Sequence, residues 1–194
     1  MNKSINWEAQ WRDFAPNFYD GKAHVDLTPQ GMLLLEPGEG FGDLSHPTTR
    51  LMLDLMKPLA TNQIVLDIGC GSGILTLASL ILGAHQAHGI DIHKGALIHA
   101  KKNAKLNLQK AQFSKKANPK TPYSLVLMNM IFSEQKVAFK KSDFSQNFQY
   151  LITSGILIQE KERYLEWCTQ MGWDLLQEKN EGEWLGFIFK CVCK

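Results

Sequence analysis

The segment from Val65 to Gly73 constrains the fold more than any other part of the chain. It reads Val-Leu-Asp-Ile-Gly-Cys-Gly-Ser-Gly, so a short apolar run ends in an acid and three glycines follow at alternate positions. The apolar run predicts a buried strand over residues 64–67, and residues 74–82 predict an apolar helix directly after it. Glycine permits a sharp turn between the two and lets a ligand approach the backbone closely. The segment therefore predicts a strand, a glycine turn and a helix, with a ligand site at the turn.

The same alternation of strands and helices continues along the chain. Further strands are predicted over residues 87–90, 111–114 and 125–128 and around 154–155, with helices over 47–59, 94–108, 134–142 and 160–171. Residues 173–177 and 184–192 predict a closing antiparallel hairpin. Strands that alternate with helices form a mostly parallel sheet covered on both faces. We therefore expect an α/β fold: a three-layer α/β/α sandwich with a Rossmann-like, seven-stranded, mostly parallel sheet and a C-terminal antiparallel hairpin.

The length of 194 residues suits one main domain, which we place at 36–194, after an N-terminal extension at 1–35. The extension contains two extended runs, 23–27 and 32–35, joined by a turn at Pro29-Gln30-Gly31. No apolar stretch approaches the roughly 20 residues that cross a bilayer, and the first residues lack the apolar run of a signal peptide. The four cysteines show no metal-ligand spacing. A cytoplasmic protein without a metal site is expected.

Asp91 ends the second strand, 18 residues beyond Gly73, and a carboxylate there can accept hydrogen bonds from both hydroxyls of a ribose. Dinucleotides require Gly-x-Gly-x-x-Gly and room for a pyrophosphate at the helix N-terminus. Here Gly69, Gly71 and Gly73 form Gly-x-Gly-x-Gly instead. Asp67 would repel a pyrophosphate but suits the ammonium of a methionine moiety. The pattern favours S-adenosylmethionine over NAD, and a tight turn without a ligand is the remaining alternative.

Asn129 follows the strand 125–128, at the same expected edge of the sheet. Its amide oxygen can accept a hydrogen bond from a target amine and hold the nitrogen lone pair in line with a methyl group; a strand-end turn is the alternative. Phe132 completes an Asn-x-x-Phe pattern, similar to the Asn-Pro-Pro-Tyr/Phe of enzymes in which an aromatic ring stacks on a base. Packing of Phe132 in the core is its alternative. Both residues are catalytic candidates.

Charge is unevenly distributed along a chain whose net charge is only +2. No acidic residue stands between Asp91 and Glu134, where the chain carries Lys94, Lys101, Lys102, Lys105, Lys110, Lys115, Lys116 and Lys120. A field of one sign attracts anions, including RNA and ribosomal surfaces. The stretch from Lys94 to Lys120 therefore indicates a possible RNA contact, and a solvated helix face and loop is the alternative.

Residues 36–49, Glu-Pro-Gly-Glu-Gly-Phe-Gly-Asp-Leu-Ser-His-Pro-Thr-Thr, resemble the PrmA family, the methyltransferases of ribosomal protein L-eleven. The family pattern there is roughly Pro-Gly-x-Ala-Phe-Gly-Thr-Gly-x-His-Pro-Thr-Thr. The segments 65–75, 89–92, 154–157 and 183–184 are also similar, so the resemblance covers nearly the whole chain. It implies a class I methyltransferase fold, S-adenosylmethionine as cofactor and a ribosomal protein or related acceptor. It further implies cofactor contacts from Thr49, Gly69, Asp91 and Asn129, with Phe41 over the cofactor.

The sequence departs from the family pattern in three places. Full-length members carry an N-terminal domain that captures the ribosomal protein, and this chain begins where that domain would end. Residues 42–45 read Gly-Asp-Leu-Ser in place of Gly-Thr-Gly-Thr, and 129–135 read Asn-Met-Ile-Phe-Ser-Glu-Gln in place of Asn-Ile-Leu-Ala-Gly-Pro-Leu. Each bears on acceptor recognition more than on cofactor binding. The leading hypothesis is N-methylation of a protein; an RNA, nucleotide or small-molecule methyltransferase and a non-enzymatic cofactor-binding module are the alternatives.

Overall fold

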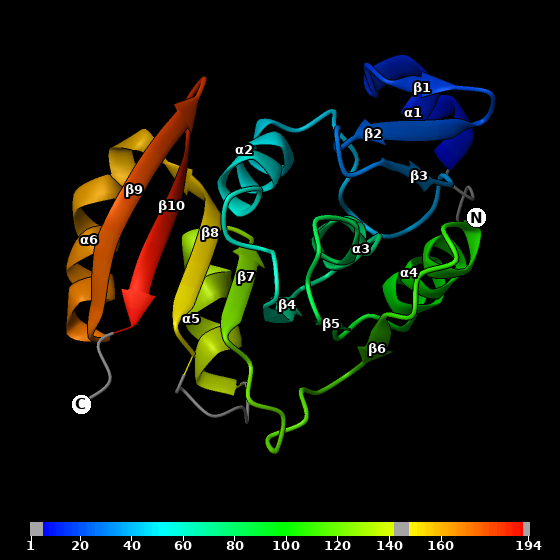
Figure 1. Ribbon diagram of the computed structural model, residues 1–194. Coiled ribbons are helices and arrows are strands. Elements are labelled where there is room, and N and C mark those ends of the chain that lie inside the picture. The colour runs from blue at the N-terminus through cyan, green and yellow to red at the C-terminus, as the bar shows by residue number, and fades with distance from the viewer. Residues whose placement is uncertain (1–5, 142–147, 192–194) are drawn as a thin grey trace.

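The computed structural model describes residues 6–141 and 148–191, and its centre is a seven-stranded sheet (Figure 1). The strand order is β6-β5-β4-β7-β8-β10-β9. The strands are β4 (Ile64–Ile68), β5 (Gln86–Ile90), β6 (Gln112–Ser114), β7 (Leu125–Asn129), β8 (Tyr150–Leu157), β9 (Trp173–Glu181) and β10 (Trp184–Cys191). The first five pair in parallel, whereas β10 is antiparallel to both β8 and β9. The predicted sheet, mostly parallel with a C-terminal antiparallel hairpin, is confirmed.

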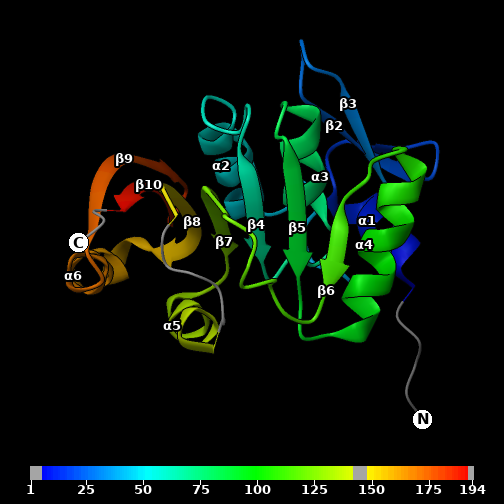
Figure 2. The same ribbon diagram turned by 60° about the horizontal axis from the view of Figure 1, so that its bottom comes forward.

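Helices cover both faces of this sheet, as the view in Figure 2 shows. They are α2 (Pro47–Met56), α3 (Ile74–Ile81), α4 (Lys94–Leu106), α5 (Phe132–Lys141), and α6 (Lys161–Gln170), which a short 3₁₀ turn, η1 (Ile158–Glu160), precedes. One buried cluster joins α2, α3 and α4 to sheet residues such as Val65 and Leu127. A second joins α5 and α6 to the alternate residues, such as Leu66 and Met128. Successive strand residues thus enter opposite cores, which makes the three-layer sandwich.

Several predicted boundaries needed adjustment. The helix α2 begins at Pro47 with His46 as its N-cap, but it ends at Met56 rather than at residue 59. Pro58 accounts for the early end, because it has no backbone N–H to donate to the Asp54 carbonyl, although Lys57 before it keeps helical geometry (φ −47°, ψ −49°). The hairpin strand β9 runs to Glu181, four residues beyond the predicted 177, because the turn falls at Gly182, whose φ is +59°. The predicted helix 134–142 and the predicted strand 184–192 each end outside the described residues. Cys193 also lies outside them.

The N-terminal segment folds onto the sandwich. It contains α1 (Trp7–Phe14), which the sequence analysis missed, and an antiparallel sheet of β1 (Phe18–Tyr19), β2 (Lys22–Asp26) and β3 (Met32–Leu35). This sheet lies over α3 and α4 in Figure 1 and shares their buried cluster. Asn107, the C-cap of α4, accepts a hydrogen bond from the backbone N–H of Leu34 (2.8 Å) and donates one to the Leu34 carbonyl (2.6 Å). Among the described residues, no helix has the length and apolar character to cross a membrane.

Candidate functional site

A cavity of about 1010 Å³ opens at the carboxyl ends of the parallel strands. Its wall includes Gly69 after β4, Asp91 after β5 and Asn129 at the end of β7. These three residues come from distant parts of the sequence and meet because parallel strands end at one edge of the sheet. With Phe41 and Gly71, which also line it, the cavity brings together five of the predicted site residues.

The glycine turn is interlocked with the loop of residues 37–46. The backbone N–H of Ser72 donates to the carbonyl of Phe41 (2.7 Å), and the Ser72 hydroxyl donates to the carbonyl of Gly42 (2.6 Å). A Cβ on Gly71 would clash with the Phe41 carbonyl, and one on Gly40 would lie 2.5 Å from the Gly71 carbonyl carbon. Gly71 is predicted to allow a sharp turn and close approach of a ligand. Its φ of +53° makes the turn, another backbone approaches it closely, and it also lines the cavity.

Asp91 and Asn129 present hydrogen-bonding atoms to the cavity. One Asp91 oxygen accepts the backbone N–H of Gly71 (3.1 Å) and the other accepts that of His93 (2.9 Å). These bonds fix the carboxylate and leave further lone pairs on both oxygens. The amide of Asn129 forms no hydrogen bond with any other residue in the described part of the chain. The Asp91 carboxylate is therefore held in one orientation, and the Asn129 amide is available to hydrogen-bond with a bound molecule.

Asp67 does not line the cavity, contrary to the expected contact with a cofactor ammonium. It is 1% exposed, and its Oδ2 accepts the backbone N–H (3.0 Å) and the hydroxyl (2.6 Å) of Thr76. Burial, with a smaller contribution from the charge of Asp91, raises the pKa of Asp67 to about 7. Its observed position joins β4 to α3 behind the glycine turn.

Three other predicted residues also lie off the cavity wall. Gly73 caps α3, and a Cβ there would lie 3.0 Å from that of Ala100. Thr49 is fully buried in α2, and its hydroxyl has no hydrogen-bond partner among the described residues. Phe132 is 4% exposed and packs edge-on against Tyr164, with ring centroids 5.1 Å apart. The structure therefore places Phe132 in the core, which was the alternative to a stacking role. Its ring is not open to a base there.

Three aromatic rings line one side of the cavity mouth, and we call them the aromatic wall: Phe41, His46 and Trp184. The centroid of the His46 ring lies 5.7 Å from that of Phe41 and 5.0 Å from that of Trp184, edge-on in both cases. Of these, only Phe41 is predicted from the sequence as a site residue. His46 directly precedes the predicted helix 47–59 and Trp184 begins the predicted strand 184–192, and neither pattern shows that the two segments meet.

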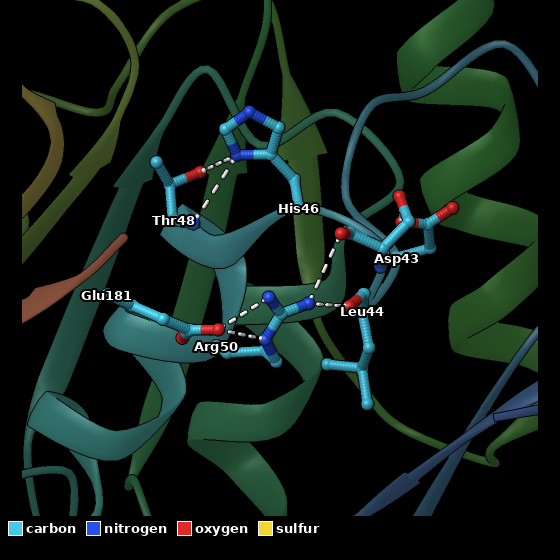
Figure 3. Close-up of polar contacts among 7 residues, drawn as sticks. Asp43, Leu44, His46, Thr48, Arg50 and Glu181 are labelled. Carbon is cyan, nitrogen blue, oxygen red and sulfur yellow. Dashed lines mark hydrogen bonds and ion pairs between the residues drawn. The ribbon is translucent and has the colours of Figure 1, made fainter. Parts of the chain in front are cut away.

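His46 is a hydrogen-bond donor rather than a base. Its Nδ1 accepts the backbone N–H of Thr48 (3.3 Å), and the Thr48 hydroxyl lies 2.8 Å from the same nitrogen (Figure 3). The ring hydrogen of the neutral side chain therefore resides on Nε2. Burial, and secondarily the charge of Arg50, lowers the pKa of His46 and favours this neutral form. Among the described residues, no group of three or more His, Cys, Asp or Glu is placed to hold a metal ion.

The sheet order, the glycine turn and the acid that ends β5 define a class I methyltransferase fold. Solved structures agree on the fold. A ribosomal protein L11 methylase from Lactobacillus delbrueckii subsp. bulgaricus superposes with a TM-score of 0.73 at 21% identity, covering 87% of this chain and 99% of that one. The 16S rRNA methylase RmtB superposes with a TM-score of 0.56 at 19% identity, covering 74% and 61%.

The family model of the ribosomal protein L11 methyltransferase (PrmA) matches residues 18–191, and the chain belongs to this family. A relative of that name from Geobacter metallireducens is 33% identical over 95% of this chain and 66% of its own length. One from Chromobacterium violaceum is 41% identical over 70% of this chain and 48% of its own. The chain thus spans from about half to two thirds of the length of such relatives.

Proposed function

We propose that the protein transfers a methyl group from S-adenosylmethionine to an amine nitrogen of a protein acceptor, with ribosomal protein L11 or a similar protein as the substrate class. The observation that carries the proposal is the position of Asn129. Its unpaired amide and the fixed carboxylate of Asp91 share one cavity, so a cofactor site and an acceptor site are continuous. The names of the relatives supply the substrate class.

The residues of the cavity fit this cofactor. Asp91 retains lone pairs for two ribose hydroxyls, and beside it the side chains of Ile90, Ile92 and Ala117 offer apolar surface to a planar base. Ile92 is 79% exposed in the protein alone, as expected for a residue whose partner is a ligand.

When bound, S-adenosylmethionine supplies an electrophilic methyl group. Asn129 accepts a hydrogen bond from the acceptor amine, which aims the nitrogen lone pair. The amine must be neutral to attack, and His46 cannot deprotonate it through Nε2, because that nitrogen already carries the ring hydrogen. We place the release of that proton in solution, before the amine reaches Asn129.

Calorimetry tests the cofactor part of the proposal. The protein is titrated with S-adenosylmethionine and, separately, with S-adenosylhomocysteine, and both are expected to bind. Asp91→Ala is expected to bind at least about tenfold more weakly, because removing a charge-assisted acceptor costs roughly 1.5 kcal/mol or more. Absence of binding at millimolar ligand, with circular dichroism showing folded protein, would contradict the proposal.

The acceptor part is tested with labelled cofactor and purified ribosomal protein L11. Label in the protein supports protein methylation. Cofactor binding without transfer to L11 or to any fraction of whole ribosomes would instead support a non-enzymatic binding module.

A second candidate function, RNA methylation or RNA contact, rests on the lysine-rich stretch. All eight lysines between Lys94 and Lys120 are exposed, and Lys115 and Lys116 line the cavity mouth. Apart from Lys116, none forms an ion pair with another described residue. RNA binding that weakens with salt, and weakens further when Lys101, Lys102 and Lys105 are changed to Ala, would support it. Label that enters ribosomal RNA and not protein would favour RNA as the acceptor.

A further inference from the structure

The loop of residues 37–46 is anchored differently in its two halves. The first half is tied to the cofactor side of the cavity. The backbone N–H of Gly40 donates to Nδ1 of His99 in α4 (3.1 Å), and the carbonyls of Phe41 and Gly42 accept hydrogen bonds from Ser72 in the glycine turn. These contacts involve neither α2 nor the hairpin β9–β10.

The second half is held by Arg50 of α2 (Figure 3). Nη1 of Arg50 donates to the carbonyls of Leu44 and Ser45 (the latter 3.2 Å). Its Nε and Nη2 donate to Oε1 of Glu181, at 2.7 and 2.5 Å. All three guanidinium nitrogens are therefore engaged, and one side chain joins α2, the loop and the end of β9. We call Arg50 and Glu181, with the two carbonyls, the brace.

The brace holds both sides of the aromatic wall. Glu181 is the cross-strand partner of Trp184 at the hairpin turn, so fixing Glu181 fixes the start of β10. The carbonyls of Leu44 and Ser45 lie directly before His46, whose ring packs against Trp184. Loss of the brace would free the hairpin end and the His46 segment from each other.

We propose that Arg50 and Glu181 are positioning residues for the methyl acceptor: they hold His46 and Trp184 of the aromatic wall at the cavity mouth, and they do not contribute to cofactor binding. This rests on the proposed function, because it assumes that the acceptor reaches Asn129 past the wall. Acceptor positioning is separate from cofactor binding because different hydrogen bonds hold the two halves of the loop. The cofactor side of the loop keeps its bonds to Ser72 and His99 when the brace is removed.

The brace should matter locally rather than for global stability. The side chains of Arg50 and Glu181 are 35% and 39% exposed. Ion pairs exposed to this degree contribute little to folding. A misplacement of about 1 Å at a reacting centre can nevertheless cost up to roughly 100-fold in rate. Lysine cannot replace Arg50, because a single ammonium lacks the planar fork that reaches a carboxylate and two carbonyls.

The test compares Arg50→Lys and Glu181→Gln with Asp54→Asn. The control removes a different ion pair between the same elements, Asp54 of α2 with Lys179 of β9 (3.7 Å), together with the contact of Asp54 to Lys57 (3.4 Å), and neither touches the loop. We expect Arg50→Lys and Glu181→Gln to raise KM for ribosomal protein L11 about tenfold, with Kd for S-adenosylmethionine within about twofold of wild type. Asp54→Asn should change neither. The Arg50→Lys/Glu181→Gln double variant should raise KM no further than the more affected single variant does. The two effects are not additive, because either substitution alone already breaks the brace.

A second measurement tests the brace without activity. The indole N–H resonance of Trp184, assigned with Trp184→Phe, should shift or broaden in Arg50→Lys and Glu181→Gln and stay unchanged in Asp54→Asn. Equal losses in Kd and KM, or an unchanged indole resonance and unchanged KM, would overturn the proposal. If wild-type protein binds no cofactor, the proposed function fails and the acceptor role fails with it, while the resonance still shows whether the brace holds Trp184.

Discussion

Asp67 and Thr76 form a buried contact in which one carboxylate oxygen accepts two hydrogen bonds, from the backbone N–H at 3.0 Å and from the hydroxyl at 2.6 Å. The contact fixes the start of α3 against the end of β4. Although these bonds favour the charged carboxylate, burial outweighs them and raises the pKa of Asp67 from 3.8 to about 7.

This raised pKa predicts a pH-dependent stability difference between wild type and Asp67→Asn. The folded state favours the protonated form of Asp67. Its contribution to the free energy of unfolding is therefore fully present below pH 3.8 and is lost as the pH rises through about 7. The full change is on the order of 4 kcal/mol. Urea unfolding at pH 4.5 and 7.5 should show wild type losing stability relative to Asp67→Asn. A difference that is the same at both pH values would show that Asp67 is ionised throughout.

Gly71→Ala tests the contact between the glycine turn and the loop of residues 37–46. Alanine would meet both the positive φ of +53° and the carbonyl of Phe41. Gly172→Ala is the matched control, since Gly172 has a φ of +78° but no atom within 4 Å of the added Cβ. The control should lose about 1 kcal/mol from backbone strain. Gly71→Ala should lose clearly more, and also weaken S-adenosylmethionine binding; equal losses would mean that the Phe41 backbone yields at no cost.

Asn129→Ala should separate methyl transfer from cofactor binding. The amide is expected to orient only the acceptor amine through its side chain, so kcat should fall about 100-fold while Kd for the cofactor changes little. Single-turnover transfer from labelled S-adenosylmethionine to ribosomal protein L11 measures the first, and calorimetry the second. A large loss of cofactor affinity would assign the Asn129 amide to cofactor binding.

His88 of β5 should stabilise the loop after β6 in a pH-dependent way. Its Nδ1 lies 2.6 Å from the Tyr123 hydroxyl and its Nε2 lies 2.7 Å from that of Ser114, which donates onward to the Lys116 carbonyl. The Ser114 hydrogen is thus committed, so His88 donates from Nε2 and accepts at Nδ1. Burial lowers the pKa of His88 below 6.5, so its contribution is present above that pH and is lost as the pH falls through the lowered pKa.

Wild type should therefore lose stability relative to His88→Leu between pH 7.5 and 5.5. Denaturant unfolding of both proteins, with Tyr123→Phe as a second variant of the same contact, measures this. An unchanged difference would mean that the pKa of His88 is the same in the folded and unfolded states.

Phe132→Leu should affect stability and leave the site intact. The ring packs among Tyr164 and Trp167, and the Lys136 ammonium lies 4.5 Å from its centroid. We expect a loss of about 1 to 2 kcal/mol from reduced packing. Kd for S-adenosylmethionine and KM for the acceptor should stay within about twofold, measured below the unfolding transition. A rise in KM for the acceptor without a change in Kd for S-adenosylmethionine would instead support the stacking role predicted for Phe132.

Periodicity predicted most of the strands and helices, because each buries a face that the sequence alternation reveals. It also predicted Asp91 and Asn129 as neighbours, since both follow strands of one parallel sheet. It missed α1, an eight-residue helix in which Trp7, Trp11 and Phe14 stand at helical spacing but only Trp11 is buried.

What a side chain faces was harder to predict. Asp67 lies so close to the glycine turn that only the fold shows it pointing to Thr76 and away from the cavity. The brace was not predictable either, because Arg50 and Glu181 are separated by 131 positions and neither belongs to a motif. Such pairs are set by the packing of α2 against the hairpin.

The backbone bond from Ser72 to Phe41 joins segments that lie about thirty residues apart, so this wall of the cavity exists only in the folded chain. A ligand that binds this wall has no counterpart site in the unfolded protein. By mass action, cofactor at 100 times its Kd would then add about 2.7 kcal/mol to the free energy of unfolding. Occupancy by S-adenosylmethionine would thus raise the share of folded molecules whenever a substitution lowers it, so the cellular level of the cofactor would set how much sequence change the fold tolerates.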